Sequence, residues 1–310
     1  MPYSSNNNIN YAEIFMPVLD AQVMQEAMTG WMDANAEAAG IEIDGNNKVH
    51  IPKMELDGLA DYSRTAGYTR GAVTLTYEEL AMTQDRGRQF FLDAMDVNES
   101  NFVASATRVM TEFQRLHVIP EIDAYRLSKL ATASITADYL ATYGYTPDKA
   151  TIVDQLIGDM ASIRKKGYRN FPLVVLARTD VVSALSKAKA DKGDQVAFKQ
   201  NGIETMVPAI DNTPILEIDD DRLVSAITLK ANEEGGFSKA STGLDVNYII
   251  CPIGTPLAVT KQNDMKVFTP QENQSADAWL IDYRRYHDLW VLDSMVNSIA
   301  VNIKDARPQG

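Results

Sequence analysis

Hydrophobic side chains recur about every 3.6 residues from Asp96 to Leu130, which is the period of an amphipathic helix. Asp96 and Glu99 have the spacing of a capping box, which predicts the start of this helix. Pro120 lacks an amide proton and disfavours helical geometry in the residue before it, so it should end or kink the helix. A second helical run from Glu121 to Leu130 completes a long rod, bent or broken once. The buried side of the rod is predicted to comprise Phe102, Val103, Ala106, Val109, Met110, Phe113, Leu116, Ile122, Tyr125 and Leu130.

Residues 46–80 have the pattern of a long hairpin. The second arm places Val73, Leu75 and Tyr77 on one side and threonines on the other, which is the period of two that a strand requires. Two strands alone are marginally stable in water. The hairpin is therefore predicted either to lie on its own domain or to reach onto a neighbouring subunit. Its polar middle contains Asp57, Gly58, Asp61, Ser63, Arg64, Gly67 and Arg70.

The rest of the chain mixes helical and strand patterns. Residues 1–10 are polar and predict a flexible arm. Helices are predicted over 11–39, 78–95, 148–166 and 179–190, and strands over 172–177, 214–218, 246–251, 256–260, 279–284, 289–292 and 296–303. The third of these helices is predicted to bury Ile152, Val153, Leu156, Ile157, Met160 and Ile163. Because no strand–helix–strand rhythm repeats, the fold class is α+β.

Composition narrows the class of protein. The 310 residues are 45% hydrophobic and 23% charged, which is typical of one large or two modest folded domains. The net charge of −13 argues against a nucleic-acid binder with a generally basic surface. A single cysteine, Cys251, excludes a disulfide framework. The sequence has neither an apolar run of about 18 residues nor a signal-peptide pattern, so we expect folding in a cytoplasm.

Candidate chemistry is sparse. The sequence has no Walker loop, no dinucleotide-binding glycine motif, no zinc-protease motif and no nucleophile elbow. His50, His117 and His287 lack metal-ligand spacing, and the acidic run 219–221 is more often a solvated turn than a cation site. Glu78 and Glu79 are adjacent, which is a poor geometry for acid–base pairing on a helix. We therefore predict no catalytic, cofactor-binding or metal-binding residues and no cofactor.

Other reactive residue types have ordinary interpretations as well. Cys251 lies in an apolar run and is predicted to be a small buried hydrophobic residue. Lys48 and Lys53, with Asn297 and Asn302, are the residue types of a Lys–Asn isopeptide bond between subunits. Surface lysines are commoner than reactive ones, so we do not predict this bond.

Three groups of segments match parts of a known family. Val49–Pro52 with 67–68 and 71–76 is similar to its extended-loop hairpin, 120–126 to the continuation of its spine helix, and 286–293 to a peripheral-domain strand. With the order of elements over nearly the whole chain, the sequence resembles the major capsid proteins of tailed bacteriophages. The resemblance implies an N-terminal arm (1–45), an extended loop (46–80), a peripheral domain with the spine helix (81–148 and 261–310) and an axial domain (149–260).

The same resemblance implies a function without an enzyme activity. Subunits would form pentamers and hexamers and assemble in the host cytoplasm into an icosahedral shell, part of the virion, with portal and decoration proteins as partners. The shell would enclose double-stranded DNA without sequence-specific binding and without a membrane. The short N-terminus implies a separate scaffolding protein. The alternatives are an encapsulin-type nanocompartment with protein cargo and an enzyme with an unrecognised site.

Overall fold

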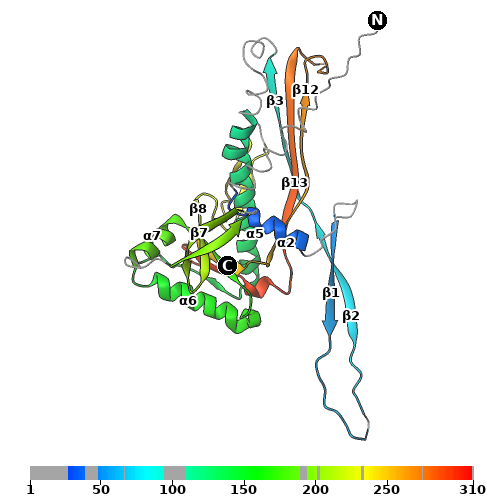
Figure 1. The fold of residues 1–310 in the computed structure, drawn as a ribbon, viewed down its shortest axis with the longest axis vertical. Helices are drawn as coiled ribbons and strands as arrows, with labels where there is room; N and C mark the ends of the chain where they lie inside the picture. The colour runs from blue at the N-terminus through cyan, green and yellow to red at the C-terminus, as the bar shows by residue number, and fades with distance from the viewer. Residues whose placement is uncertain are drawn as a thin grey trace.

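A helical rod and the long strand β13 (Ala278–Val291) lie along the long axis of the molecule, and a hairpin extends roughly along the same axis past the other end of β13 (Figure 1). The computed structural model describes residues 27–38, 48–65, 67–93, 109–188, 194–200, 203–231, 234–273 and 275–308. The predicted helix start at Asp96, the apolar positions 102–106, the arm over 1–10 and most of the helix over 11–39 lie outside these residues. Of that last helix, η1 (Gly30–Met32) and α2 (Asp33–Ala38) are described.

The rod is helical without interruption over residues 109–137. It comprises an α-helical turn, the π-helical segment η2 (Gln114–Val118) and α5 (Ile119–Ala137). At about 1.5 Å per residue, it is about 43 Å long. Pro120 is the second residue of α5 and does not end the helix, so that alternative of the prediction is wrong. The wide π turn ends two residues before the proline, which removes one helical hydrogen bond and crowds the preceding turn.

The π turn also changes which side of the rod is buried. Met110 is buried and Phe113 half-buried as predicted, but Leu116 is 55% exposed and Gln114 is buried in its place. A π turn holds one residue more than an α turn, so the side chains after it are rotated by about 100° relative to a regular helix. The prediction for Leu116 is therefore wrong. Beyond the π turn, the predicted burial of Ile122, Tyr125 and Leu130 is confirmed.

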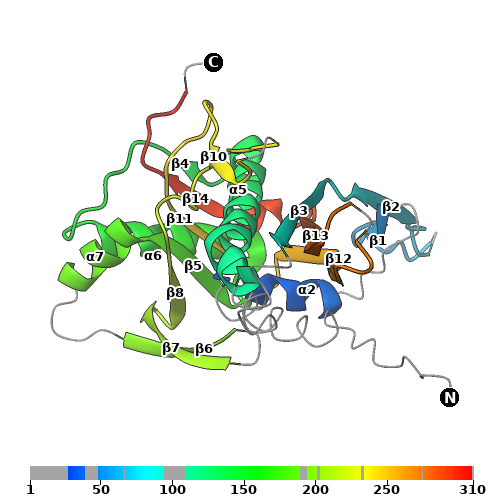
Figure 2. The same cartoon turned by 90° about the horizontal axis from the view of Figure 1, so that it is seen from above.

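A seven-stranded mixed sheet forms the larger lobe. Its strands in spatial order are β4 (Ala141–Thr142), β14 (Ala300–Ile303), β11 (Val246–Pro252), β5 (Leu173–Arg178), β8 (Thr213–Ile218), β7 (Ile203–Ile210) and β6 (Asp194–Gln200). Helices α6 (Ile152–Ile163) and α7 (Thr179–Ala188) lie on one face, and α5 lies on the other (Figure 2). Both faces of β5 are buried, which confirms the interior strand predicted over 172–177.

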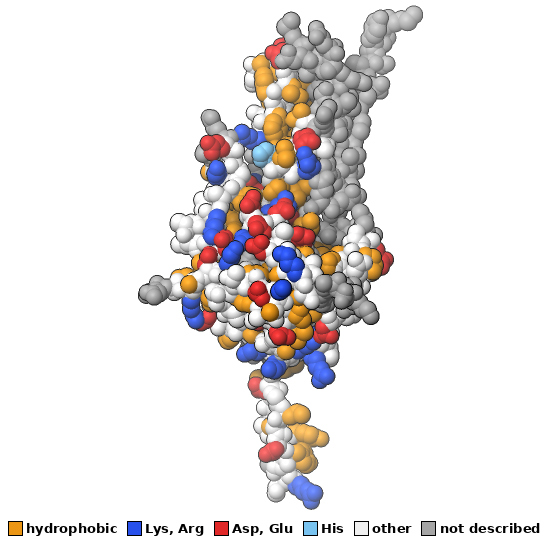
Figure 3. All heavy atoms as spheres, turned by 90° about the vertical axis from the view of Figure 1, so that its left-hand side faces the viewer, with side chains coloured by type: hydrophobic (Ala, Val, Ile, Leu, Met, Phe, Trp, Pro, Cys, Tyr) orange, Lys and Arg blue, Asp and Glu red, His pale blue; other side chains and the backbone are white. Residues whose placement is uncertain are grey.

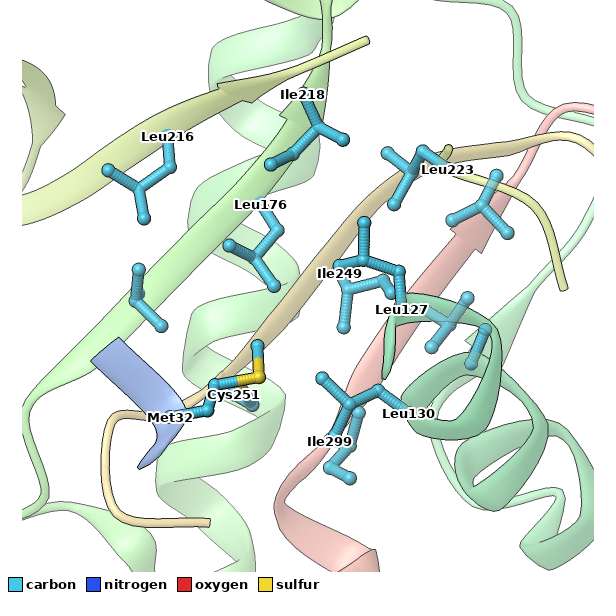
Figure 4. Packing of buried hydrophobic residues seen from close by; sticks show 14 of the residues in the cluster. Met32, Leu127, Leu130, Leu176, Leu216, Ile218, Leu223, Ile249, Cys251 and Ile299 are labelled. Atoms are coloured by element: carbon cyan, nitrogen blue, oxygen red, sulfur yellow. The ribbon is translucent and has the colours of Figure 1, made fainter. Parts of the chain in front are cut away.

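Side chains of the central strands alternate between two hydrophobic cores. The core on the α5 side contains Leu127 and Leu130 from the helix, Leu176 from β5 and Cys251 from β11 (Figure 4). The core on the other side contains Val175 and side chains of α6 and α7. On α6 the predicted burial of Ile152, Leu156, Met160 and Ile163 is confirmed, but Ile157 is 44% exposed and that prediction is wrong. This helix continues into a second π turn, η3 (Arg164–Tyr168).

A three-stranded antiparallel sheet packs against the first part of the rod. Its order is β12 (Pro256–Phe268), β13 and β3 (Gln84–Asp93). The ring of Phe113 lies 4.8 Å from that of Phe90 on β3 and 5.9 Å from that of Tyr283 on β13, so the rod packs directly on this sheet. After the short helix η4 (Val296–Ser298), β14 pairs with β11 in the other sheet. There it lies near the later part of the rod, where the hydroxyl of Ser134 donates to the carbonyl of Ile299 at 2.8 Å.

The helix predicted over 78–95 is wrong. Its first residues complete β2 (Val73–Ala81), which pairs with β1 (Lys48–Leu56), and residues 84–93 form β3. Residues 84–93 form ten consecutive pairs with β13, and long-range pairing of this kind overrides weak local helix propensity. A small hairpin of β9 (Ile227–Leu229) and β10 (Phe237–Lys239) completes the fold. None of the described helices combines the length and apolar character that a membrane span requires.

Gly87 of β3 is the position where this pairing allows no side chain. A Cβ atom there would lie 2.9 Å from the carbonyl oxygen of Tyr283, so we expect Gly87→Ala to lower the free energy of unfolding by about 1–3 kcal/mol. The matched control is Gly158→Ala on α6, where a Cβ would meet no described atom within 4 Å and should stabilise the helix by about 0.5–1 kcal/mol. Urea unfolding of the unassembled subunit measures both, and equal effects would contradict the strand pairing.

Candidate functional site

The hairpin β1–β2, with its connecting segment 57–72, is called the arm from here on. It pairs from Lys48 opposite Ala81 to Leu56 opposite Val73 without a bulge, and Figure 1 shows it extending away from the seven-stranded sheet. Its end is held by its own backbone, since Ser63 and Gly67 exchange hydrogen bonds of 3.2 and 2.7 Å. The described residues of 57–65 are all exposed, so the arm does not lie on its own domain. The sequence had left open whether the hairpin lies on its own domain or reaches onto a neighbouring subunit.

One face of the arm is apolar and exposed to solvent. Residues opposite each other in antiparallel strands share a face, which places Met54 beside Leu75 and Leu56 beside Val73. Leu56 and Val73 are 65% and 68% exposed. The other face carries Lys53, Thr74, Thr76 and Glu78. Figure 3 shows hydrophobic side chains along one side of the arm, below the body of the molecule.

The base of the arm is anchored in a small hydrophobic cluster. Ile51 and Leu80 pack against Met82, Val259 and Trp290, so the arm leaves the body only beyond this point. Asp288 on β13 is buried, and its carboxylate accepts a hydrogen bond from Thr83, two residues after the end of β2. These contacts join the arm to the three-stranded sheet.

Asp288 connects the arm base to the rod. One carboxylate oxygen accepts hydrogen bonds of 2.8 Å from both the backbone amide and the hydroxyl of Thr83. The other accepts hydrogen bonds of 2.7 Å from the hydroxyl of Tyr125 on α5 and 2.8 Å from the amide of Leu289. A buried carboxylate with four donors is fixed in direction, so the start of β3 has one position relative to the rod. Asp288 was not predicted from the sequence, although a carboxylate directly before the apolar run 289–292 was a usable signal.

Two further buried charges hold the segment before the arm against the rod. The guanidinium of Arg126 pairs with both carboxylate oxygens of Asp33, at 2.7 and 2.9 Å. Asp123 accepts hydrogen bonds from the amide and hydroxyl of Thr29, at 3.0 and 2.6 Å, and from Arg222 at 3.2 Å. Bidentate pairs of this kind fix geometry as well as contributing energy. These contacts hold η1 and the start of α2 against the rod.

The structure separates the residues that were considered for metal binding. His50 lies on β1, His117 is exposed on the π turn, and His287 is buried on β13. The acidic run 219–221 follows β8, where Asp219 pairs with Arg222 and Asp220 with Arg178. The negative charges of these two carboxylates are therefore neutralised by arginines of the same chain. In the described part of the chain, no three histidine, cysteine or acidic side chains are grouped to hold a metal ion.

The remaining candidate residues have structural roles. Cys251 is fully buried, as predicted, and burial raises the pKa of its thiol to about 12. Glu78 lies on a strand, and partial burial followed by repulsion from Asp293 raises its pKa. The amide of Asn302 is buried and hydrogen-bonded to Asn247 and to Thr142. This asparagine is therefore engaged within its own subunit.

Only the comparison with solved structures finds matches, and those described here share one fold. No protein-family model and no curated protein matches the sequence. Among solved structures, the mature capsid of bacteriophage PhiM1 matches with a TM-score of 0.58 and 11% identity, over 84% of this chain and 82% of that chain. The capsid of cyanophage P-SCSP1u matches with a TM-score of 0.58 and 10% identity, over 84% of both chains. A virus-like particle from Pyrococcus furiosus matches with a TM-score of 0.53 and 10% identity, over 95% of this chain and all (100%) of that chain.

The chain therefore has the fold of phage major capsid proteins. The predicted α+β class and the predicted resemblance are both confirmed by these structures. These solved structures with this fold are phage capsids and a virus-like particle. The arm is the part of the fold that projects from the rest of the subunit.

His287 makes the stability of the subunit depend on pH. Burial first, and then repulsion from Arg285, Arg126 and Arg86, holds its pKa well below the usual value. The unfolded chain binds a proton near its ordinary pKa of about 6.5, whereas the folded chain does not, so acidification favours unfolding. Between about pH 6.5 and the lower folded pKa, stability should fall by about 1.4 kcal/mol per pH unit from this group.

Urea unfolding of the unassembled subunit at about pH 7 and about pH 5.5 measures this effect. In His287→Gln the added loss at the lower pH should disappear, leaving only the dependence due to carboxylates. A parallel pH dependence in the two proteins would show that His287 titrates normally in the folded chain.

Proposed function

We propose that this protein is the major capsid protein of a tailed bacteriophage, which self-assembles into an icosahedral shell around the genome and has no catalytic role. The observation that carries the proposal is the arm, which presents an apolar face to solvent and projects from a body with a capsid-protein fold. Contiguous exposed apolar surface of this kind is typical of protein–protein contact sites. A neighbouring subunit is the partner that a shell supplies.

The energetics favour an intermolecular role for the arm. A two-stranded ribbon is at best marginally stable alone in water. Burial of one large apolar side chain contributes about 1.5–3 kcal/mol, so several such residues on one face form a strong contact once covered. Because the described contacts of the arm with its own subunit end near Ile51 and Leu80, this contribution becomes available only on assembly.

The division of labour in the proposed shell follows the two sheets. The axial part, centred on 149–260, forms the contacts within pentamers and hexamers, and the seven-stranded sheet also takes in β4 and β14. The peripheral part comprises the rest of 81–148 and 261–310, and the extended loop 46–80 corresponds to the arm. The net charge of −13 suits a container for packed DNA, because strong attraction to phosphate would oppose its release. A separate scaffolding protein and a portal are the proposed further partners, and the mature location is the virion.

A nanocompartment with protein cargo is the second candidate. The match to a virus-like particle from Pyrococcus furiosus, which covers 100% of that chain, supports shell formation without indicating the contents of the shell. The contents of purified particles distinguish the two candidates. Nuclease-protected DNA is expected for a phage capsid, and a co-purifying protein without DNA for a nanocompartment.

Self-assembly is the direct test of both candidates. The protein, produced with and without its scaffolding protein, should form closed shells that are visible by negative-stain electron microscopy and sediment as particles. Rings of five or six subunits are the expected smaller species. A strict monomer across concentration and salt, with the scaffolding protein present, would overturn the proposal.

The two faces of the arm should differ in their effect on assembly. We expect Val73→Ser with Leu75→Ser, on the apolar face, to abolish or strongly reduce particle formation. Each lost contact weakens association by roughly 1.5–3 kcal/mol, or at least about tenfold. The melting temperature of the unassembled subunit should change by at most a few degrees, since both side chains are exposed in the subunit.

Thr74→Ser with Thr76→Ser is the matched control, because it changes two residues of the same strand on the opposite face. Particle counts and thermal melts are compared for the two double variants. Equal particle yields would mean that the apolar face is not an assembly contact. A large fall in melting temperature for the first variant alone would mean that the arm packs on its own subunit.

A further inference from the structure

A pocket of about 310 Å³ lies between the rod, the three-stranded sheet and the β9–β10 hairpin. Its volume is at the lower end of the range for small-molecule sites. One part of its wall is aromatic and the other part is charged, with more cationic side chains than carboxylates. The aromatic part comprises Phe90, Phe113 and Tyr283. The charged part comprises Arg86, Arg88, Arg285 and Lys230 with the carboxylates of Glu121 and Glu234, and Glu234 pairs with Lys230 at 3.4 Å.

Strand register brings the three guanidiniums to one face of the sheet. Arg86 pairs with Arg285 across the strands, and Arg88 pairs with Tyr283, the next residue on the same face. Alternate residues of a strand share a face, and diagonal neighbours lie within reach of long side chains. Like charges placed directly opposite each other are unfavourable. The sheet therefore concentrates positive charge at this wall of the pocket.

Only part of this charge is neutralised within the described chain. The guanidinium of Arg86 pairs with the carboxylate of Glu121, at 2.8 and 3.0 Å, and donates to the carbonyl of Lys230 at 3.0 Å. Arg88 and Arg285 form no ion pair with a described carboxylate. Arg285 is 7% exposed, and it donates from Nη2 to the hydroxyl of Thr260 at 3.2 Å. Its Nε is buried without a hydrogen-bond partner among the described residues.

His287 and the π turn mark the same pocket. His287 lines it, is 4% exposed, and its Nδ1 also has no partner in the described part of the chain. Burial and the nearby arginines lower its pKa, as a positive local potential requires. His117 and Val118 of the π turn line the opposite wall. Insertions of this kind in helices are frequent at functional sites.

We propose that this pocket binds a small organic anion. Its carboxylate or phosphate head lies at Arg88 and Arg285, and its apolar body packs against Phe90, Phe113 and Tyr283. Guanidinium groups match oxyanions in geometry and donate charge-assisted hydrogen bonds to them. A buried cation is costly without a counter-charge, and the bound head supplies one. The site lies on the rod and the sheet rather than on the arm, so it does not depend on the proposed shell function.

Isothermal titration calorimetry of the unassembled full-length subunit tests the proposal. The probes are phenyl phosphate, benzoate, inorganic phosphate and phenol. At least one of the two aromatic anions should bind at one site per chain, at least about tenfold more tightly than inorganic phosphate or phenol. Whichever aromatic anion binds more tightly identifies the head group. Absence of binding by both aromatic anions at millimolar concentration would overturn the proposal, and equal affinity for inorganic phosphate would overturn the role of the aromatic wall.

Arg88→Gln should weaken binding by about tenfold or more, and because Arg88 is exposed the subunit should remain folded. Arg285→Gln should have a similar effect, and its folding is checked by circular dichroism. The matched control is Arg284→Gln, next in sequence but exposed and paired with Asp85 on the other face. It should leave the dissociation constant within about twofold. Wild-type affinity in Arg88→Gln would contradict the proposed site.

Discussion

One helix has to pack against two different sheets, and much of the structure follows from this constraint. The first turns of the rod contact the three-stranded sheet through Met110 and Phe113, and the later turns contact the seven-stranded sheet through Leu127 and Leu130. A regular α-helix would keep one buried stripe in line along its length. The π turn at 114–118 rotates that stripe between the two sheets, and Pro120 follows two residues after its end.

Buried charges fix the directions that hydrophobic packing leaves open. Asp288 joins β13, the start of β3 and α5 through four hydrogen bonds, and Arg126 with Asp33 holds the segment before the arm. Apolar contacts are non-directional, so they stabilise the body without setting the angle at which the arm leaves it. Hydrogen-bonded ionic groups have specific geometry, and breaking one leaves a costly unpaired charge. A subunit that must present an arm in one direction needs this kind of connection.

The arm and the pocket divide the surface between two kinds of recognition. The arm exposes apolar side chains such as Leu56 and Val73 and is closed at its end by its own backbone. The pocket is small, aromatic and cationic in a chain whose net charge is −13. Arg88 and Arg285 form no ion pair within the described residues, so they concentrate positive charge at this pocket although the protein as a whole is acidic. The apolar face suits a protein neighbour, and the cationic pocket suits a small anion.

The sequence by itself determined the elements whose pattern is local and strong. Alternation in Val73, Leu75 and Tyr77 defined the second strand of the arm through its period of two. The apolar run 172–177 favoured an interior strand because it is short and rich in β-branched residues. Tertiary structure decided the rest. Residues 84–93 became a strand through pairing with β13, and the burial of Gln114 instead of Leu116 follows from a π turn that no local period reveals. The direction of the arm and the convergence of Arg88 with Arg285 also depend on strand register, which joins residues about two hundred positions apart, as in the pair Tyr283 and Arg88.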